Sequence, residues 1–388
     1  MSTTTRLAFI PRDGIFCKDG RGWFTSSSGR GHGLDWPWPS TILGALRTAW
    51  GRGEEARTSS LFSREDWRTR TAAIHLGRAI ALRRAHGEGW RADHAMWPVA
   101  TDAQWLDKRD AVRRLEPVER ATRTLGRDDD DAREALRWPS FDDAQKPIAP
   151  PRWWTSDELT TWLAGGALLA RSADSKLATV RRRQAHVSIH ADTMTADDGK
   201  LFSHDVVETF DATSEWAIGV EAELPNEAVL RTATVGSDSR VARVESLPAT
   251  VFEPPVRVLE AFRAKSRGLR LMATTPLCFR NGWLPDGMES SDGVYRGALP
   301  GVAGDVVLRA AFVARPLAIS GWDMADSKPK PTSRMVAPGA VYFFERASGE
   351  PFDEGDARAL WLAPLGARTD AGFGRVVPGI FSPRRSTR

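Results

Sequence analysis

The chain has 388 residues and a mass of 42.7 kDa, which is long for a single hydrophobic core and favours two domains. It is 41% hydrophobic and 27% charged, contains no apolar run of about eighteen residues, and has no secretory segment at its start. These features argue against an integral membrane protein or an exported one. We therefore expect a cytoplasmic protein without a membrane partner.

The cysteine content and the charge limit which kinds of binding site the sequence can form. Cys17 and Cys278 are the only cysteines, so the sequence offers neither a disulfide framework nor a CxxC metal site. The net charge is +4 and the pI about 9.3, and arginine outnumbers lysine. Arginine binds phosphate bidentately and stacks on bases, so this bias suits RNA. A GC-rich genome would give the same bias, and both readings stay open.

The first predicted elements are a strand at residues 6–10 and a helix within residues 34–50. A loop rich in Gly, Ser and Arg at residues 20–33 separates them, and Ser40 is expected to cap a helix that starts immediately after it. The apolar residues of this helix recur three and four apart, at Ile42, Leu43, Leu46, Ala49 and Trp50. This pattern fits the first half of a ferredoxin-like βαβ unit, or the first helix of any α+β domain.

Residues 63–86 and 103–126 read as charged helices, the first capped by Ser63. The acidic run at 128–131 is expected to be a surface turn rather than a metal site, because four adjacent carboxylates cannot converge on one ion without a dedicated loop. A short helix at 157–163, capped by Thr155 or Ser156, ends at two glycines. We place the domain boundary there, with domains at 1–165 and 166–388 and a helical insertion at about 53–150.

The second half is richer in strand signals, which predicts a second α+β domain of ferredoxin-like type. One helix is expected at residues 256–264. The clearest predicted strands lie at residues 187–189, 216–222, 306–313 and 341–344.

Two loops in this half have the chemistry of a nucleic-acid contact. Lys328, Lys330 and Arg334 lie in a proline-stiffened loop at residues 327–338, where cations could neutralise phosphates, although a merely solvated loop would look the same. In Gly372-Phe373-Gly374-Arg375, glycines allow close backbone approach, the phenyl ring can stack and the arginine adds charge. An ordinary hairpin turn is the alternative.

Histidines are the remaining candidates. His186 and His190 follow three arginines, at residues 181–183, and their spacing puts them on one face of a strand or helix. On an RRM-like sheet that face can meet RNA. A zinc site is not favoured, because this pair lacks a third and a fourth ligand.

Six segments, taken in order, carry a family resemblance. They include the Pro-Ser-Thr opening of the first helix at 39–41, the Gly-x-Leu-aromatic turn at 199–202, the Ser-Gly-Trp-Asp segment at 320–323 and the final Gly-Phe-Gly. The full set lies at residues 36–47, 153–165, 186–202, 235–240, 275–285 and 319–374. Together they resemble the third RAMP subunit of the type III-B CRISPR (Cmr) effector complex. Two motifs depart from that family: residues 182–186 replace Glu-x-Arg-x-Gly, and Gly236-Ser237-Asp238 replaces a double glycine.

The resemblance implies a noncatalytic subunit with two ferredoxin-like (RRM-like) domains and no cofactor or metal. It would hold the 5′ tag of the guide RNA and bind the large polymerase-like signalling subunit and the first backbone RAMP subunit. The residues that we expect to contact RNA are Arg30, His32, Ser40, Thr41, Arg47, Arg182, Arg183, His186, His190, Arg240, Lys328, Lys330, Arg334, Gly372, Phe373, Gly374 and Arg375.

Two alternatives remain. A metal-independent endoribonuclease of the RAMP superfamily would need a histidine as general acid or base, and His32 lies in a loop that could reach substrate. A scaffold that touches only protein is the third possibility. The chain has no phosphate-binding P-loop, no Gly-x-Ser-x-Gly elbow and no His-Glu-x-x-His pair.

Overall fold

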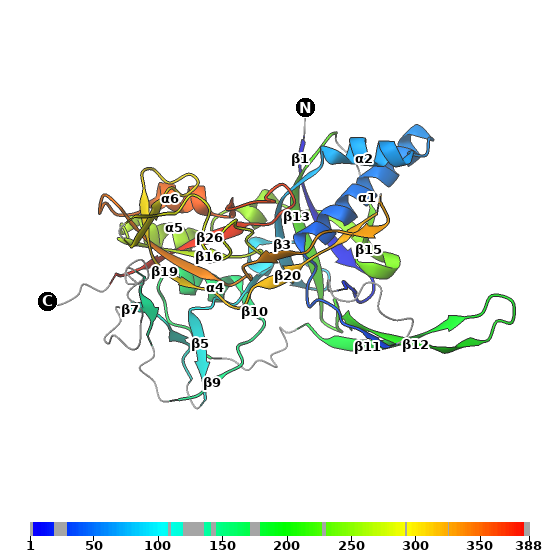
Figure 1. Cartoon of the computed structure of the whole chain (residues 1–388), viewed down its shortest axis with the longest axis horizontal. Coiled ribbons are helices and arrows are strands. Elements are labelled where there is room, and N and C mark those ends of the chain that lie inside the picture. The colour runs from blue at the N-terminus through cyan, green and yellow to red at the C-terminus, as the bar shows by residue number, and fades with distance from the viewer. Residues whose placement is uncertain are drawn as a thin grey trace.

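The computed structural model of the chain describes residues 3–18, 29–107, 110–118, 136–140, 145–170, 179–226, 230–291, 293–324 and 326–383. The acidic run at 128–131, most of the loop at 20–33 and the end of the expected helix at 103–126 lie outside these residues. Two antiparallel sheets dominate the fold, with α1 and α2 at one end and α5 and α6 at the other (Figure 1). Among the described residues, no helix combines the length and apolar character needed to cross a membrane.

The first sheet has seven strands in the order β10-β4-β3-β13-β1-β15-β14, and every neighbouring pair is antiparallel. Its strands are β1 (Thr3–Pro11), β3 (His75–Ala85), β4 (Ala95–Pro98), β10 (Trp153–Thr155), β13 (Ser214–Leu224), β14 (Thr232–Val235) and β15 (Arg240–Ser246).

The inner strand β1, which lies between β13 and β15, contributes buried side chains to both faces of the sheet because they alternate along it. Leu7 and Phe9 pack with the apolar stripe of α1, whereas Ala8 and Ile10 belong to the large core that continues into the second sheet. One strand therefore joins the outer helical layer to the centre of the molecule.

Helix α1 (Pro39–Thr58) confirms the predicted apolar stripe, since Ile42, Leu46 and Trp50 are all buried. The expected cap is wrong. Trp38 occupies the N-cap without a side-chain hydrogen bond, and Pro39 takes the first helical position, which its fixed φ and missing N–H suit. Ser40 therefore lies inside the first turn of α1.

Helix α2 (Arg64–Ala72) has the predicted Ser63 cap, reinforced by Asp66, but it is shorter than expected. Residues 75–85 form β3 instead, paired with β13 over nearly its whole length. Residues 103–107 and 110–118 are likewise not helical. They contribute β5 (Ala103–Leu106), β6 (Arg113–Arg114) and β7 (Pro117–Val118), so the part of the expected insertion that the structure describes between residues 103 and 118 forms short strands, while residues 119–135 lie outside the described residues.

The second sheet also has seven strands, in the order β17-β18-β19-β24-β16-β26-β25. The predicted helices at 157–163 and 256–264 are confirmed as α4 (Ser156–Leu163), capped by Thr155, and α5 (Val256–Arg263). The strands and last helix are β16 (Gly268–Ala273), β17 (Glu289–Ser291), β18 (Val294–Gly297), β19 (Val306–Phe312), β24 (Val341–Arg346), α6 (Glu354–Leu360), β25 (Ala363–Pro364) and β26 (Arg375–Phe381).

Four strands in each sheet share one order. In chain order they are β1, β3, β13 and β15 in the first sheet, and β16, β19, β24 and β26 in the second. In each set the first strand lies between the third and the fourth, and the second flanks the third. A split β-α-β repeat has this arrangement. A complete ferredoxin-like unit has two helical crossovers. Among the described residues, α-helices lie in only one crossover of each sheet, with α1 and α2 between β1 and β3 and α6 between β24 and β26. The mixed helix and antiparallel-sheet class is confirmed, while two complete ferredoxin-like domains are not.

The strands of the first sheet come from residues 3–246 and those of the second from residues 268–381. A division at residue 165 would separate β13, β14 and β15 from the sheet in which they pair. The chain passes from one sheet to the other between β15 and β16, through η3 (Ala249–Phe252) and α5.

A third sheet is built on a long hairpin of β11 (Arg181–Ile189) and β12 (Ala196–Val207), which extends away from the body (Figure 1). Strand β2 (Gly29–Gly31) pairs with β12 in parallel. The remaining short elements are η1 (Ala92–His94), β8 (Trp138–Pro139), β9 (Pro147–Ile148), η2 (Ser237–Ser239), β20 (Leu317–Ile319), β21 (Trp322–Asp323), β22 (Lys328–Pro329) and β23 (Ser333–Met335).

Candidate nucleic-acid interface

A groove of about 1090 Å³ runs beside α1, between that helix, β14 and the loop at residues 320–330. Four cationic side chains line it, and no Asp or Glu is among the described residues that do so. The four cations are Lys18, Arg52, Arg231 and Lys330. We call this surface the basic groove. Its charge suits a polyanion.

Hydroxyl groups surround these cations. On α1, Thr41 and Thr48 lie on the same face of the helix as the cation Arg52. The other lining hydroxyls belong to Ser40, Thr232, Thr234, Ser237, Ser239 and Ser320. Hydroxyls and guanidinium groups both bind phosphate oxygens, so the groove can follow a phosphodiester backbone.

The cations of the groove differ in how far the protein satisfies them. Arg52 forms an ion pair with Glu55 at 2.9 Å. Arg231 and Lys330 are exposed, and the described residues provide no ion pair to either. The backbone of Lys330 is fixed by hydrogen bonds with Gly321 and Ser320, both 2.8 Å long. Two cations therefore remain available to a ligand, and one of them projects from an ordered position.

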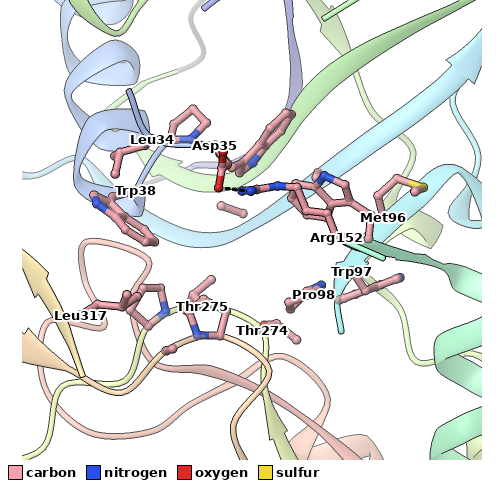
Figure 2. Close-up of a pocket in the computed structure, with 18 of the residues that line it drawn as sticks. Leu34, Asp35, Trp38, Met96, Trp97, Pro98, Arg152, Thr274, Thr275 and Leu317 are labelled. Atoms are coloured by element: carbon pink, nitrogen blue, oxygen red, sulfur yellow. Dashed lines mark ion pairs between the residues drawn. The ribbon is translucent and has the colours of Figure 1, made fainter. Parts of the chain in front are cut away.

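An aromatic cavity of about 780 Å³ adjoins the groove, and Trp38 lines both. Figure 2 shows Leu34 and Trp38 on the side of α1, with Thr274, Thr275 and Leu317 across the cavity. Asp35 is paired with Arg152 and Arg181, so its carboxylate adds little net negative charge. Burial lowers the pKa of Arg152 to about 10, and its guanidinium stays charged at neutral pH.

The comparisons with known proteins give one family. The family model of CRISPR-associated protein (Cas_Cmr3) matches residues 8–380. The chain belongs to this family. Membership confirms the resemblance to the third RAMP subunit of the type III-B CRISPR complex. No curated protein matches the chain.

Two solved structures are similar to this Cas_Cmr3 chain at low identity. The first is the cryo-EM structure of the type III-B Cmr-beta bound to cognate target RNA and AMPPnP, state 1, with 13% identity and a TM-score of 0.42. The second is Cmr-beta bound to cognate target RNA, with 13% identity and a TM-score of 0.41. In each case the alignment covers 87% of this chain and 86% of the other.

Of the predicted RNA-binding residues in this Cas_Cmr3 chain, Ser40, Thr41 and Lys330 line the basic groove. Lys328 and Arg334 come from the same predicted loop and do not line it. Lys328 is exposed and forms an ion pair with Asp326 at 3.1 Å, and Arg334 is exposed on β23. The loop is therefore divided, with one lysine facing the groove and the other already paired.

A second group of predicted residues surrounds Asp205 on the hairpin sheet. Arg30 holds this buried carboxylate with two nitrogens, at 2.7 and 3.0 Å, and its guanidinium keeps the pKa of Asp205 below its usual value. The Nδ1 atom of His32 is 3.9 Å from the same carboxylate. Arg182 pairs with Glu208, and Arg183 is exposed beside them. This cluster is largely satisfied within the protein.

Arg47 and Arg240 serve the fold. Arg47 donates to the carbonyl oxygen of Ile74 at 3.2 Å, and burial lowers the pKa of its guanidinium. Arg240 donates to Asp13 at 2.6 Å and to Gln184 at 2.9 Å. Neither lines the groove, and the contacts that both make are within the protein.

The prediction that His186 and His190 lie on one face of a strand or helix is wrong. The register of β11 shifts between residues 187 and 189, the strand ends at Ile189, and His190 lies exposed in the turn that follows. His186 instead packs against Phe202, with stacked rings 5.2 Å apart, and beside His204. The neighbours of His186 are therefore Phe202 and His204 on the adjacent strand, and not His190.

The turn Gly372-Phe373-Gly374-Arg375 also differs from the prediction. Phe373 is fully buried, so its ring is not available to stack on a base. Gly372 has φ 83°, and a Cβ there would approach Leu76 to 2.7 Å, since the turn packs against the first sheet. A Cβ on Gly374 would lie 2.3 Å from the carbonyl oxygen of Leu365. The two glycines therefore allow close packing of the turn against Leu76 and Leu365, and not the close approach of RNA that the sequence suggested.

Arg375 is buried in the same region. It donates to the carbonyl oxygen of Thr369 at 2.7 Å, and burial lowers its pKa to about 10. A guanidinium that is held by the backbone and shielded from solvent cannot neutralise an incoming phosphate without rearrangement.

Three cations of the groove were not predicted: Lys18, Arg52 and Arg231. A signal existed for Arg52, because Thr41, Thr48 and Arg52 follow the helical repeat on the polar side of a predicted helix. Arg231 had no local signal, since β14 meets α1 only through the long-range pairing of the first sheet.

Proposed function

We propose that this chain is a noncatalytic, guide-RNA-binding subunit of a type III-B CRISPR effector complex, and that the basic groove holds the 5′ tag of the guide. The observation that carries the proposal is the groove itself, with cations and hydroxyls on all three walls and no Asp or Glu among its described lining residues. Family membership supplies the type of complex.

The chemistry of the groove fits a single strand. Each phosphate that a cation neutralises releases condensed counterions, so affinity falls as salt rises. The adjoining cavity, lined by Trp38, Trp97 and Trp153, offers apolar surface to a base that has left a stack. The phosphodiester backbone would follow the groove, and one nucleobase would enter beside Trp38.

The test is charge reversal of the two groove cations to which the described residues provide no ion pair, Arg231→Glu with Lys330→Glu. We expect the assembled complex to lose the guide while the variant chain keeps its circular dichroism spectrum and melting temperature. Lys328→Glu is the matched control, because that lysine belongs to the same loop but is paired with Asp326 outside the groove. Equal guide retention in all three proteins would refute the groove assignment.

The partners proposed are the large polymerase-like signalling subunit and the first backbone RAMP subunit, within the cytoplasm. The hairpin offers a surface for one of them, because Val187, Ile189 and Leu201 are exposed although apolar. Val187→Asp with Leu201→Asp should prevent co-purification with one partner and leave binding of a short guide RNA by the isolated chain unchanged.

The noncatalytic assignment has its own test. The isolated chain, incubated with repeat-containing RNA in EDTA, should leave the RNA intact. A specific cut that disappears in His32→Ala would instead establish a metal-independent endoribonuclease, with His32 acting beside Asp205.

A further inference from the structure

The hairpin sheet brings together three potential metal ligands that are distant in sequence. His186 is on β11, His204 is two residues out of register with it on β12, and Asp238 is in η2, just before β15. Their ligand atoms all lie within 4.8 Å of one another. The two histidines are diagonal neighbours on one face of an antiparallel pair, which brings their rings into contact.

Aromatic neighbours hold both imidazoles in place. His204 stacks on Phe16, with ring centroids 4.1 Å apart and planes at 12°, and His186 stacks on Phe202 with planes at 9°. Asp238 has φ 61°, a left-handed conformation that aspartate tolerates better than most residues. This conformation places the carboxylate Oδ2 of Asp238 3.4 Å from the Nδ1 atom of His204.

Each histidine of the cluster has a nitrogen that is shielded from solvent and makes no regular hydrogen bond to the described residues, although Nδ1 of His204 lies 3.4 Å from the Asp238 carboxylate. Among the described residues, neither Nε2 of His186 nor Nδ1 of His204 has a hydrogen-bond partner of regular geometry. Buried polar atoms are nearly always paired, so two such atoms side by side indicate a missing partner.

We propose that His186, His204 and Asp238 bind a divalent transition-metal ion, with Zn²⁺ as the best fit. Two imidazoles and one carboxylate match the donors that zinc prefers, and ligand atoms around a tetrahedral zinc lie about 3.3 Å apart. The separation of His204 and Asp238 already has this value, and small side-chain rotations would bring His186 closer. The side chain of Asp238 is 42% exposed, which gives the ion a route from solvent.

Arg240 is a nearby cation that opposes the ion, with a guanidinium nitrogen 3.6 Å from the carboxylate of Asp238. Its other contacts draw it away from the site, since it donates to Asp13 and Gln184. A bound metal would replace the weaker contact of Arg240 to Asp238 and keep the two shorter ones.

The ion would tie the hairpin to the first sheet. Its ligands come from both hairpin strands and from the turn that leads into β15, so one metal would fix the hairpin where it leaves the body. This inference does not depend on RNA binding by the groove, and either can fail without the other.

The experiment uses the full chain, stripped with EDTA, dialysed, and titrated with ZnCl₂ in a calorimeter. We expect one Zn²⁺ per chain and a higher melting temperature with zinc than without. Titration with Co²⁺ should give the visible absorption of a tetrahedral site. Absence of binding, of the thermal shift and of the absorption band would overturn the proposal.

Two substitutions distinguish a built site from adventitious binding. Asp238→Asn removes the anionic ligand and keeps a residue that tolerates positive φ, so affinity should fall by at least about tenfold without loss of fold. His190→Ala is the control, since this exposed histidine is on the same hairpin outside the cluster. Equal zinc affinity in wild type and Asp238→Asn, or loss of binding in His190→Ala, would refute the assignment.

Discussion

The basic groove and the turn at residues 372–375 contain the same kinds of residue and have opposite environments. Both combine cations, an aromatic ring and glycine, which is the composition that suggests RNA in a sequence. In the groove, Lys330 is exposed and no acidic side chain is among the described lining residues. In the turn, Phe373 and Arg375 are buried. Availability of a cation, and not its presence, separates a binding surface from a packing surface.

A buried arginine with internal partners is also found at the centre of the molecule. Arg270 of β16 is almost fully buried, yet it pairs with Asp102 at 2.9 Å and donates to the carbonyl oxygen of Trp162 at 3.0 Å. Trp162 in turn donates to Asp102 at 2.9 Å. These contacts join the second sheet to α4 and the segment after β4. Arginine here belongs to the core, and the comparison predicts that removing a partner costs stability and leaves RNA binding alone.

The largest effect is therefore expected for Asp102→Ala, which leaves the buried Arg270 without its counter-charge. Breaking such a pair costs about 3–5 kcal/mol of unfolding free energy. Urea denaturation of the variant should show this loss. Asp157→Ala is the control, because its ion pair with Arg257 is exposed and worth at most about 1 kcal/mol. Similar losses in the two variants would contradict the distinction between buried and exposed cations.

A slightly smaller effect is expected for Phe373→Ala. Its ring packs with Ile319 and Met335, so truncation leaves a cavity in a small core and should cost about 3 kcal/mol. The affinity of the folded variant for guide RNA should be unchanged, as measured under conditions where it stays native. Normal stability with lost RNA binding would restore the role in base stacking that the sequence suggested for this turn.

How far the sequence predicts the fold depends on how local the interactions are. The stripe on α1 and the Thr155 cap of α4 are contained within one turn or two of helix, and both are confirmed. Strand β3 was predicted as the end of a helix because Arg83 and Arg84 suit a helix C-terminus. In the structure Arg84 and Arg78 pair with Glu215 and Glu221, which lie directly opposite on β13. No local window contains those partners.

The candidate site follows the same rule. Lys330 and the first turn of α1 were found from their own chemistry, and Arg52 could have been found from helical spacing. Arg231 could not, because the pairing of β14 with β15 brings it to the groove. The burial of Arg375 was also invisible, since the residues that cover its turn come from the first sheet.

An intermediate effect on binding, with none on stability, is expected for Lys330→Ala. Losing one phosphate contact on a single strand should make the slope of log K against log salt shallower by about 0.7. Fluorescence anisotropy with a labelled guide at several salt concentrations measures it. Lys328→Ala should leave the slope as it is, because Asp326 already partners that lysine. A change of slope in Lys328→Ala alone would reverse the assignment of the two lysines.

The smallest effect is expected where exposed cations already have an acidic partner. Arg263 of α5 and Arg358 of α6 both contact Glu354, each at 2.6 Å, and they lower the pKa of its carboxyl to about 2. A carboxyl with a depressed pKa stabilises the fold above its unfolded pKa of about 4.3 and loses that contribution as pH falls towards 2. Glu354→Gln removes the charge at every pH.

The melting temperatures of wild type and Glu354→Gln should therefore differ at neutral pH and converge as pH falls from about 5 to about 2. The variant frees two arginines, yet they lie on α5 and α6, away from the groove, so guide affinity should not rise. A melting difference that persisted at low pH would assign the effect of Glu354 to packing. Tighter guide binding would mean that any unpaired exposed arginine serves, because the geometry of the groove would then contribute nothing beyond charge.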